Sequence, residues 1–224
     1  MAQKSSIGMK RLKGPAEMPS RLQRNARERL LEAASDLMGE GDTINVSLRN
    51  VAERAQLNAS LIKYYFGNKD RMLLEVVEHD HRPVIADMRA VADGPESAEV
   101  KLRALIRIMI VALHRYPYSN RLLMAMLRDF APEHSQVVAD RLVKPMMASV
   151  LDVLKAGMAS GEFRPHNPDF IWLNLAGACA QGFSIQALLR HVYQRGPFNQ
   201  HERDEYGDQI ASIFVSGLRS DAVG

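Results

Sequence analysis

The stretch NASLIKYYF, which begins at Asn58, gathers many hydrogen-bonding side chains into one short segment. Asn58 and Ser60 offer short polar groups, Lys63 offers an ammonium group, and Tyr64 and Tyr65 offer hydroxyls. Such groups bind phosphate oxygens and the edges of bases. They need a rigid support that holds them on one exposed face, so the neighbouring sequence must supply a helix and a core behind it.

Residues 47–66 predict two short helices joined by a tight turn. Ser47 is a suitable N-cap for the first helix, which runs to about Ala55, and Asn58 is a suitable N-cap for the second. Apolar residues line one face of each helix: Leu48, Val51, Ala52 and Ala55 on the first, and Leu57, Ile62 and Tyr65 or Phe66 on the second. This is helix-turn-helix spacing. A helix from about Leu22 to Met38 supplies the third wall of the small core.

In a helix-turn-helix the second helix enters the major groove of DNA, and residues near its start reach the base edges. We expect Lys63 to donate to guanine or to phosphate, and the tyrosine hydroxyls to hold phosphates. The start of the first helix, at Ser47, offers N–H groups to a phosphate oxygen. The predicted DNA-binding residues are Ser47, Arg49, Asn58, Ala59, Ser60, Lys63, Tyr64, Tyr65 and Lys69.

The charge of the chain is unevenly distributed. Residues 1–72 hold 13 Lys/Arg and 8 Asp/Glu, whereas the remainder holds 16 and 18. A basic first third favours contact between that end and a polyanion. Residues 1–20 combine Gly, Pro and basic residues without periodicity, and we interpret them as a disordered basic arm.

The pattern of the rest of the chain predicts helices separated by Pro and Gly, and it predicts no strand. A helix begins near Asn68, with Pro83 as a kink or stop. Further helices begin after Asp93, at Ser119 or Asn120, and after Pro132. A long apolar helix runs from Pro168 to about Tyr193, with Asn167 as its N-cap. We therefore predict an all-α fold of about nine helices. Its parts are the arm (1–20), a helix-turn-helix DNA-binding domain (21–67) and a larger helical domain (68–224).

Enzyme and membrane functions have little support in the sequence. GxSxG, HExxH, phosphate-loop and GxGxxG motifs are absent. His79 and His81, in EHDHR, are two residues apart and do not share a helix face, so we expect no metal site. Cys179, the single cysteine, lies among Ala and Gly and reads as a buried, inert thiol. Apolar stretches are shorter than the roughly 20 residues that span a bilayer, so the predicted location is the cytoplasm. We also predict no cofactor.

The run SLRNVAERAQLNASLIKYYFGNKDRMLL resembles the N-terminal domain of the tetracycline-repressor (TetR) family. The matching positions are Ser47, Val51–Ala52, Tyr65–Phe66, Lys69–Asp70 and Leu73, and RERLLEAASDLMGEG is similar to the family's first helix. The close match covers about residues 22–75; beyond it, the turn GEFRP is similar to the link before the family's penultimate helix. Gln56 departs from the usual turn glycine and Lys63 from a common tyrosine.

The resemblance implies a homodimer that binds a double-stranded DNA operator and an unknown small-molecule effector. It also implies that residues 68–224 form the effector-binding and dimerisation domain. Small residues in the apolar helix after Pro168, together with the last helix, suit a four-helix dimer interface. The expected interface residues are Ala178, Gly182, Ile185, Ile210, Ile213, Phe214 and Gly217. The expected pocket residues, chosen for adaptable or large apolar side chains, are Met88, Met109, Leu113, Met124, Phe130, Met147, Leu151, Trp172 and Phe183.

The resulting hypothesis is a ligand-responsive repressor that an effector releases from a palindromic operator. Two alternatives remain: a nucleoid-type protein that coats DNA without sequence preference, and a helical-bundle enzyme. Phosphate contacts alone would serve the first alternative and would make all binding salt-dependent. The effector, the operator, the regulated genes and the choice between repression and activation are not specified by these residues.

Overall fold

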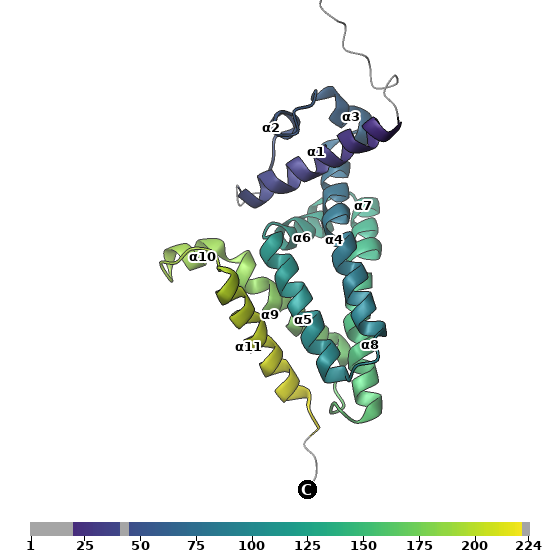
Figure 1. Ribbon diagram of the computed structural model, residues 1–224, viewed down its shortest axis with the longest axis vertical. Helices are drawn as coiled ribbons and strands as arrows, with labels where there is room; N and C mark the ends of the chain where they lie inside the picture. Colours follow the sequence, from purple (N-terminus) through teal and green to yellow (C-terminus); the bar gives the residue numbers. More distant parts are fainter. Residues whose placement is uncertain (1–19, 41–44, 221–224) are drawn as a thin grey trace, which may run out of the picture.

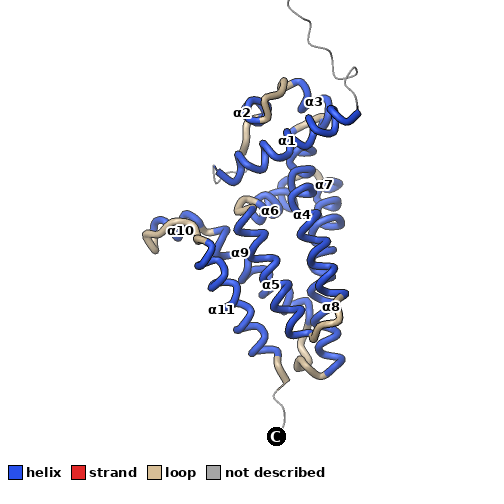
Figure 2. Tube along the Cα trace, viewed as in Figure 1, coloured by secondary structure: helices blue, strands red, loops and turns tan. Residues whose placement is uncertain are grey.

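The computed structural model describes residues 20–40 and 45–220 and is helical throughout its regular parts (Figure 1). Three N-terminal helices form one end of an elongated molecule, and long helices run from there towards the other end (Figure 1). Figure 2 shows helices and loops but no strand in the described ranges, where β-type pairing is limited to an isolated bridge between Phe163 and Arg219. The predicted all-α class is confirmed, whereas the proposed basic arm falls outside the described residues except for Ser20.

The N-terminal end consists of α1 (Ser20–Glu40), α2 (Leu48–Arg54) and α3 (Ser60–Phe66). Helix α4 (Lys69–Asp93) follows at once and runs from this end into the body of the molecule (Figure 1). Asn68 caps α4, because its side chain accepts a hydrogen bond from the Arg71 N–H at 2.9 Å. The helix-turn-helix unit is therefore joined to the body through a continuous helix.

The body consists of the helices that follow α4 along the chain. They are α5 (Ala98–Arg115), α6 (Ser119–Asp129), α7 (Pro132–Val138), the π-helical segment η2 (Ala139–Val143), α8 (Lys144–Ser160), α9 (Pro168–Ser184), α10 (Gln186–His191) and α11 (Gln200–Leu218). Helix α5 packs against α4, α8, α9 and α11. Its central position lets it carry much of the core of the body.

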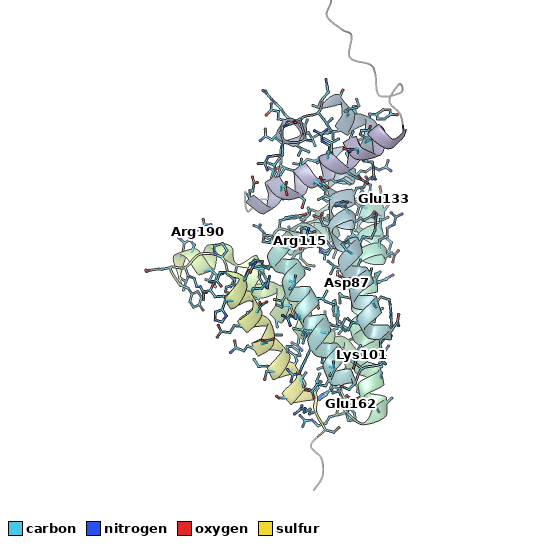
Figure 3. The ribbon with its side chains drawn as sticks, viewed as in Figure 1. Asp87, Lys101, Arg115, Glu133, Glu162 and Arg190 are labelled. Atoms are coloured by element: carbon cyan, nitrogen blue, oxygen red, sulfur yellow. The ribbon has the colours of Figure 1, made fainter. Side chains whose placement is uncertain are left out.

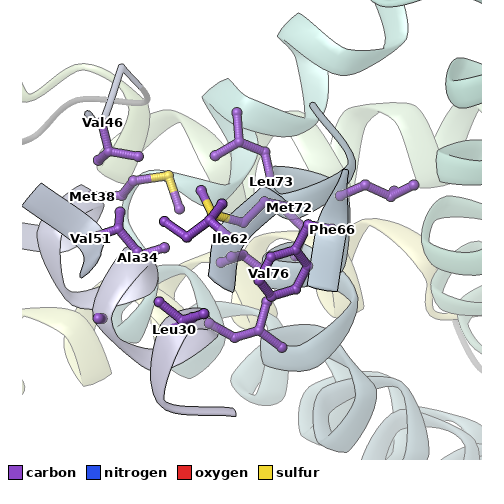
Figure 4. Packing of buried hydrophobic residues seen from close by; sticks show 14 of the residues in the cluster. Leu30, Ala34, Met38, Val46, Val51, Ile62, Phe66, Met72, Leu73 and Val76 are labelled. Atoms are coloured by element: carbon purple, nitrogen blue, oxygen red, sulfur yellow. The ribbon is translucent and has the colours of Figure 1, made fainter. Parts of the chain in front are cut away.

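The core of the helix-turn-helix end continues into the body. Leu30, Ala34, Ile62, Phe66 and Met72 are fully or almost fully buried and pack together (Figure 4). The same cluster extends to Tyr118, which directly precedes α6, and to residues of α6, α7 and η2, namely Leu122, Met126, Val138 and Leu142. The domain boundary expected at residues 67 and 68 remains a prediction, since packing is continuous across it.

A second core fills the far part of the body. Leu102, Leu105 and Ile106 on α5 are fully buried there. Gly157 on α8 is needed at a close approach, because a Cβ at this position would lie 2.3 Å from a ring carbon of Phe163. Charged side chains such as Asp87 and Glu133 lie on the outer surface (Figure 3).

A stop at Pro83 and one long helix after Pro168 are both wrong, whereas a kink at Pro83 stays a prediction. Helix α4 does not stop at Pro83; the proline is exposed and lies inside the helix, which continues to Asp93. The long helix expected from Pro168 to Tyr193 is broken at Ile185, where φ is −109° and ψ is 37°. The break is followed by a return of the chain that places Phe198 against Phe183, with ring centroids 5.6 Å apart.

Helix starts follow the predicted caps with two differences, at Asn58 and at Ser47; the N-cap position of α3 is Ala59, one residue later than expected. Asn167 accepts a hydrogen bond from the Asp169 N–H at 2.9 Å, and Pro168 occupies the first turn of α9, as expected. Asn58 accepts from the Ser60 N–H at 2.8 Å, and α3 begins at Ser60. Ser47 stands at the N-cap position of α2, but its side chain forms no capping hydrogen bond.

Candidate DNA-binding surface and ligand cavity

The outer face of α3, with the turn before it, is open to solvent. Asn58, Ala59, Ser60, Lys63 and Tyr64 are all exposed, and they form what we call the α3 ridge. The ridge is held in this orientation because the opposite face of the helix is buried through Leu61, Ile62 and Phe66. The side chains of Lys63 and Tyr64 are therefore open to another molecule, whereas the Asn58 side-chain oxygen already accepts from the Ser60 N–H.

The turn between α2 and α3 adopts the left-handed conformation that its sequence disfavours. Gln56 has φ of +54° in place of the glycine usual there. The Leu57 N–H donates to the Ala52 carbonyl at 2.9 Å, and the Gln56 N–H donates to the Glu53 carbonyl at 3.0 Å. This is the Schellman pattern, which satisfies the last carbonyls of α2. A residue other than glycine is strained at this positive φ.

Other predicted DNA-binding residues flank the ridge in different settings. Ser47 and Arg49 are exposed at the start of α2, and the Arg49 Nε donates to the Glu53 carboxylate at 2.7 Å. The Lys69 Nζ donates to the Asn45 side chain at 2.7 Å. These cations lie at the same end of the molecule as the ridge and are positioned by neighbouring side chains.

Tyr65 is placed differently from the rest of the predicted set. Its ring packs against the N-terminal core, and its hydroxyl is enclosed without a hydrogen-bond partner in the described chain. Burial raises the pKa of this hydroxyl. The adjacent Tyr64 is 54% exposed and meets Tyr65 edge to face. Of the two tyrosines, Tyr64 is the one that presents its hydroxyl outwards.

A cavity of about 250 Å³ lies within the body. Its wall comes from α4, α5, α6, η2, α8 and α9. The lining residues are Val77, His81, Val84, Met109, Ala112, Leu113, Ser119, Asn120, Leu123, Met124, Leu142, Val143, Met146, Trp172, Leu173, Ala176 and Ala180. A mostly apolar concave site with a few polar groups is the usual form of a small-molecule pocket.

Four of the nine expected pocket residues line this cavity: Met109, Leu113, Met124 and Trp172. The other five lie elsewhere. Met88, Leu151 and Met147 belong to the second core, Phe130 packs against the N-terminal core, and Phe183 lies beside His114, Phe198 and Tyr206. On α8 it is Met146 that reaches the cavity, because consecutive residues of a helix point about 100° apart.

The polar lining residues were absent from the expected set. His81 is 8% exposed, and its Nδ1 lies 3.1 Å from the Val77 carbonyl oxygen. Burial lowers the pKa of this imidazole below its ordinary value. Ser119 and Asn120 line the cavity at the start of α6, and the Asn120 amide donates to the Ser184 hydroxyl at 2.8 Å. A search for apolar residues at helical spacing misses such polar groups. The motif EHDHR, which holds His81, and the turn at Pro117, shortly before Ser119 and Asn120, could have drawn attention to them.

Next to the cavity wall lies a buried polar cluster that joins three helices. Asp80 on α4 is 3% exposed and accepts hydrogen bonds from the Ser35 hydroxyl of α1 at 2.7 Å and from the Tyr118 hydroxyl. His79 Nδ1 lies 3.0 Å from the other carboxylate oxygen. Burial and then the charge of Asp80 raise the pKa of Tyr118. Asp80 and Tyr118 directly precede the lining residues His81 and Ser119, so this cluster links the cavity to α1.

Helices α9 and α11 carry exposed apolar side chains. Phe170 and Leu173 on α9 are 62% and 64% exposed, and Ile213 on α11 is 64% exposed. Of the expected interface residues, Ile213 and Gly217 are exposed and Ala178, Ile185 and Phe214 are half-buried.

Gly182 and Ile210 need correction as surface residues, because both are buried inside the protomer. A Cβ on Gly182 would lie 2.8 Å from Phe198 and 2.9 Å from Tyr206, so this glycine serves packing within the chain. Phe170 and Leu173, which the sequence reasoning left out, are the large apolar residues that α9 presents to solvent.

The residues considered for enzyme chemistry are placed apart. Cys179 is fully buried, and burial raises the pKa of its thiol to about 12. His79 and His81 point in different directions, since His81 is buried and His79 is partly exposed. Among the described residues no group of three or more His, Cys, Asp or Glu is arranged to hold a metal ion. None of the helices in the described ranges is both long and apolar enough to cross a bilayer.

Comparison with known sequences identifies both ends of the chain. Residues 30–76 match the family of bacterial regulatory proteins, TetR family, and residues 95–222 match the tetracyclin repressor-like C-terminal domain. The HTH-type transcriptional regulator BetI of Brucella anthropi is 27% identical over 82 residues, which are 37% of this chain and 42% of the relative. BetI of Agrobacterium fabrum is 29% identical over 82 residues, 37% of this chain and 40% of the relative. The match thus spans about two fifths of the length of these relatives.

Solved structures share the fold over most of the chain. The transcriptional regulator FadR from Bacillus subtilis, solved in complex with stearoyl-CoA, has a TM-score of 0.66 at 17% identity and covers 86% of this chain and 99% of its own. A TetR/AcrR-family regulator from Thermobifida fusca has a TM-score of 0.65 at 22% identity and covers 87% and 98%. Because the C-terminal family match alone spans more than half of the sequence, this chain belongs to the TetR family of bacterial regulatory proteins.

Proposed function

We propose that this protein is a ligand-responsive, DNA-binding transcriptional regulator, a repressor that a small molecule releases from a palindromic operator. The observation that carries the proposal is the exposed α3 ridge on a helix whose opposite face is buried in the helix-turn-helix core. Helix α3 is set to enter a major groove with Asn58, Ser60 and Lys63 towards base edges. Ser47, Arg49 and Lys69 then supply contacts to the phosphate backbone. The site of action is chromosomal DNA in the cytoplasm.

A symmetric dimer supplies the second helix-turn-helix unit. The apolar residues that α9 and α11 expose, Phe170, Leu173 and Ile213, support a four-helix contact between two copies. A two-fold axis would present two α3 ridges to successive major grooves, about 34–36 Å apart, and so would favour a palindromic site.

The cavity supports the ligand-responsive part of the proposal. Helix α4 contributes Val77 and His81 to the cavity, and its earlier residues Met72 and Val76 to the helix-turn-helix core. A ligand that changes the position of α4 would therefore change the spacing of the α3 ridges. A full reversal from mostly bound to mostly released requires the ligand to prefer one state by about 5.5 kcal/mol.

Fluorescence anisotropy with labelled duplexes tests DNA recognition directly. We expect the protein to select a palindrome from the DNA flanking its own gene and to hold it against excess mixed-sequence competitor at raised salt. A nucleoid-type coating protein would instead lose all duplexes together as salt rises, because phosphate contacts dominate its binding. A folded dimer that shows no preference for any duplex would refute the proposed function.

A further inference from the structure

The chemical character of the cavity wall restricts the class of effector. Among the residues that the structure describes, no Asp, Glu, Lys or Arg lines the cavity. A charged ligand group enclosed there would lose its hydration without gaining an ion-pair partner, which is strongly unfavourable. Trp172 is the one aromatic ring other than His81 in the wall, so the described lining does not form an aromatic cage for a quaternary ammonium group.

His81 adds a specific hydrogen-bonding position to this wall. Its Nδ1 faces the Val77 carbonyl at 3.1 Å, so the neutral ring carries its proton on Nδ1 and leaves Nε2 as an acceptor. Nε2 has no hydrogen-bond partner among the described residues. The lowered pKa of His81 keeps the ring in this neutral form at physiological pH. The ring therefore suits a neutral donor, such as a hydroxyl, on a bound molecule.

The volume of the cavity sets the size of that molecule. An apolar cavity of 150 Å³ accommodates benzene, so a cavity of about 250 Å³ holds roughly ten non-hydrogen atoms by simple scaling. We propose that the effector is an uncharged, mainly apolar molecule of about that size, with a hydroxyl group that donates to Nε2 of His81. This inference rests on the proposed function, because it concerns the effector of the same cavity.

Three probes with one ten-carbon chain separate the charge classes: decan-1-ol, decanoate and decyltrimethylammonium, each added to the purified full-length protein at pH 7.5. Trp172 lines the cavity and is the single tryptophan of the chain, so its fluorescence reports occupancy without a label. We expect decan-1-ol to bind at least tenfold more tightly than either ion. Equal or tighter binding of decanoate or of the ammonium probe overturns the inference, as does the absence of any response to decan-1-ol.

A matched pair of variants tests whether the missing cation causes the selectivity. Met124 lines the cavity and is 48% exposed, so Met124→Lys places an ammonium group at its mouth without burying it fully. We expect this variant to bind decanoate at least fivefold more tightly than the unaltered protein does. Val100→Lys, at a position 50% exposed and outside the cavity, adds the same charge and should leave the preference unchanged. Equal effects of the two variants would contradict the inference.

The role of His81 is tested by removing the donor from the probe and the acceptor from the protein. We expect 1-methoxydecane, which lacks the hydroxyl proton, to bind several-fold more weakly than decan-1-ol. His81→Phe should abolish that difference, and circular dichroism checks that the variant is folded. The comparison of the two probes on the unaltered protein remains valid even if the variant fails to fold. Equal affinities of the unaltered protein for decan-1-ol and 1-methoxydecane would refute the hydroxyl contact.

Operator binding by the same preparation, measured without any probe, keeps the two proposals distinguishable. If an operator is selected but decanoate binds as well as decan-1-ol, the effector class is wrong and the regulator function stands. If no duplex is selected, the regulator function fails irrespective of which probe enters the cavity.

Discussion

Lys63 is the cation on the α3 ridge and occupies a place where a tyrosine is common in the family that the chain resembles. Lys63→Ala should weaken operator binding by about 1–3 kcal/mol if the ammonium contacts a base, with relaxed discrimination at one position of each half-site. Loss of a phosphate contact would instead weaken binding to all DNA sequences alike and lower the slope of the salt dependence by about one. Anisotropy titrations against single-base operator variants at several salt concentrations separate these outcomes.

Lys155→Ala serves as the control for this prediction. Lys155 is exposed on α8, in the body of the molecule and away from the α3 ridge. Its loss changes the net charge by the same amount and should leave operator affinity unchanged. Unaltered affinity and selectivity of the Lys63 variant would mean that the recognition face has been placed wrongly.

Gln56 has a conformation that costs free energy in the folded state. Its φ of +54° favours glycine, so Gln56→Gly should stabilise the protein by about 0.5–1 kcal/mol after the entropy of the added glycine is counted. Urea unfolding followed by circular dichroism measures the change. Gln209→Gly, at an exposed position inside α11, is the matched control and should destabilise by about 1 kcal/mol. Destabilisation by both changes would contradict strain at Gln56.

The outward face of α3 and the unusual turn residue Gln56 could be recognised from residue types, because both depend on local sequence. The amphipathic pattern of residues 47–66 determines which side chains of α3 face outwards, and the position of Gln56 within the turn determines its φ. Tyr65 shows the limit of that reasoning. Helical spacing left either Tyr65 or Phe66 for the core, and the structure packs both inwards, with the Tyr65 hydroxyl enclosed. Only tertiary packing settles how far such a side chain turns.

At the scale of elements, α4 connects the two functional regions, and the cluster around Asp80 holds it to α1 and α6. Tyr118→Phe removes a hydroxyl donor from a buried carboxylate and should lower stability by about 1–3 kcal/mol. Tyr193→Phe, at a position 63% exposed, should change stability by less than about 0.5 kcal/mol. The urea midpoints of the two variants provide the comparison.

A double variant tests whether the cluster acts as one unit. Ser35, Asp80 and Tyr118 share hydrogen bonds, so the effects of Ser35→Ala and Tyr118→Phe should not add. An interaction energy of about 0.5 kcal/mol or more between them is expected. Strict additivity would show that the hydroxyls contribute independently and would remove the reason to treat the cluster as a link between α1 and the body.

Element boundaries could be predicted where a local signal marks them. Asn68 and Asn167 cap α4 and α9 through side-chain hydrogen bonds, as their positions before helical segments suggested. The break at Ile185 carries no such signal, because it accompanies a distant contact between Phe183 and Phe198. The cavity likewise depends on how six elements meet, so a list of methionines and aromatics found only part of its wall.

At the scale of the whole molecule, the exposed apolar side chains of α9 and α11 predict self-association. Ile213→Glu places a carboxylate at a position 64% exposed in the protomer and enclosed in the proposed dimer. Each copy would bury an unpaired charge, so we expect a shift from dimer to monomer in size-exclusion chromatography with light scattering. Val100→Glu, also exposed but on α5, should remain dimeric. A dimeric Ile213→Glu protein would move the interface elsewhere.

The seclusion of Cys179 makes the protein convenient for spin labelling. Because this one sulfhydryl is enclosed in α9 and resists ionisation, methanethiosulfonate reagents should leave the native protein unmodified. An Asn50→Cys substitution on the exposed side of α2 would then carry a nitroxide at a single position in each protomer. In the proposed dimer, pulsed electron paramagnetic resonance would measure the distance between the two nitroxides, and so between the two helix-turn-helix units, before and after an effector is added.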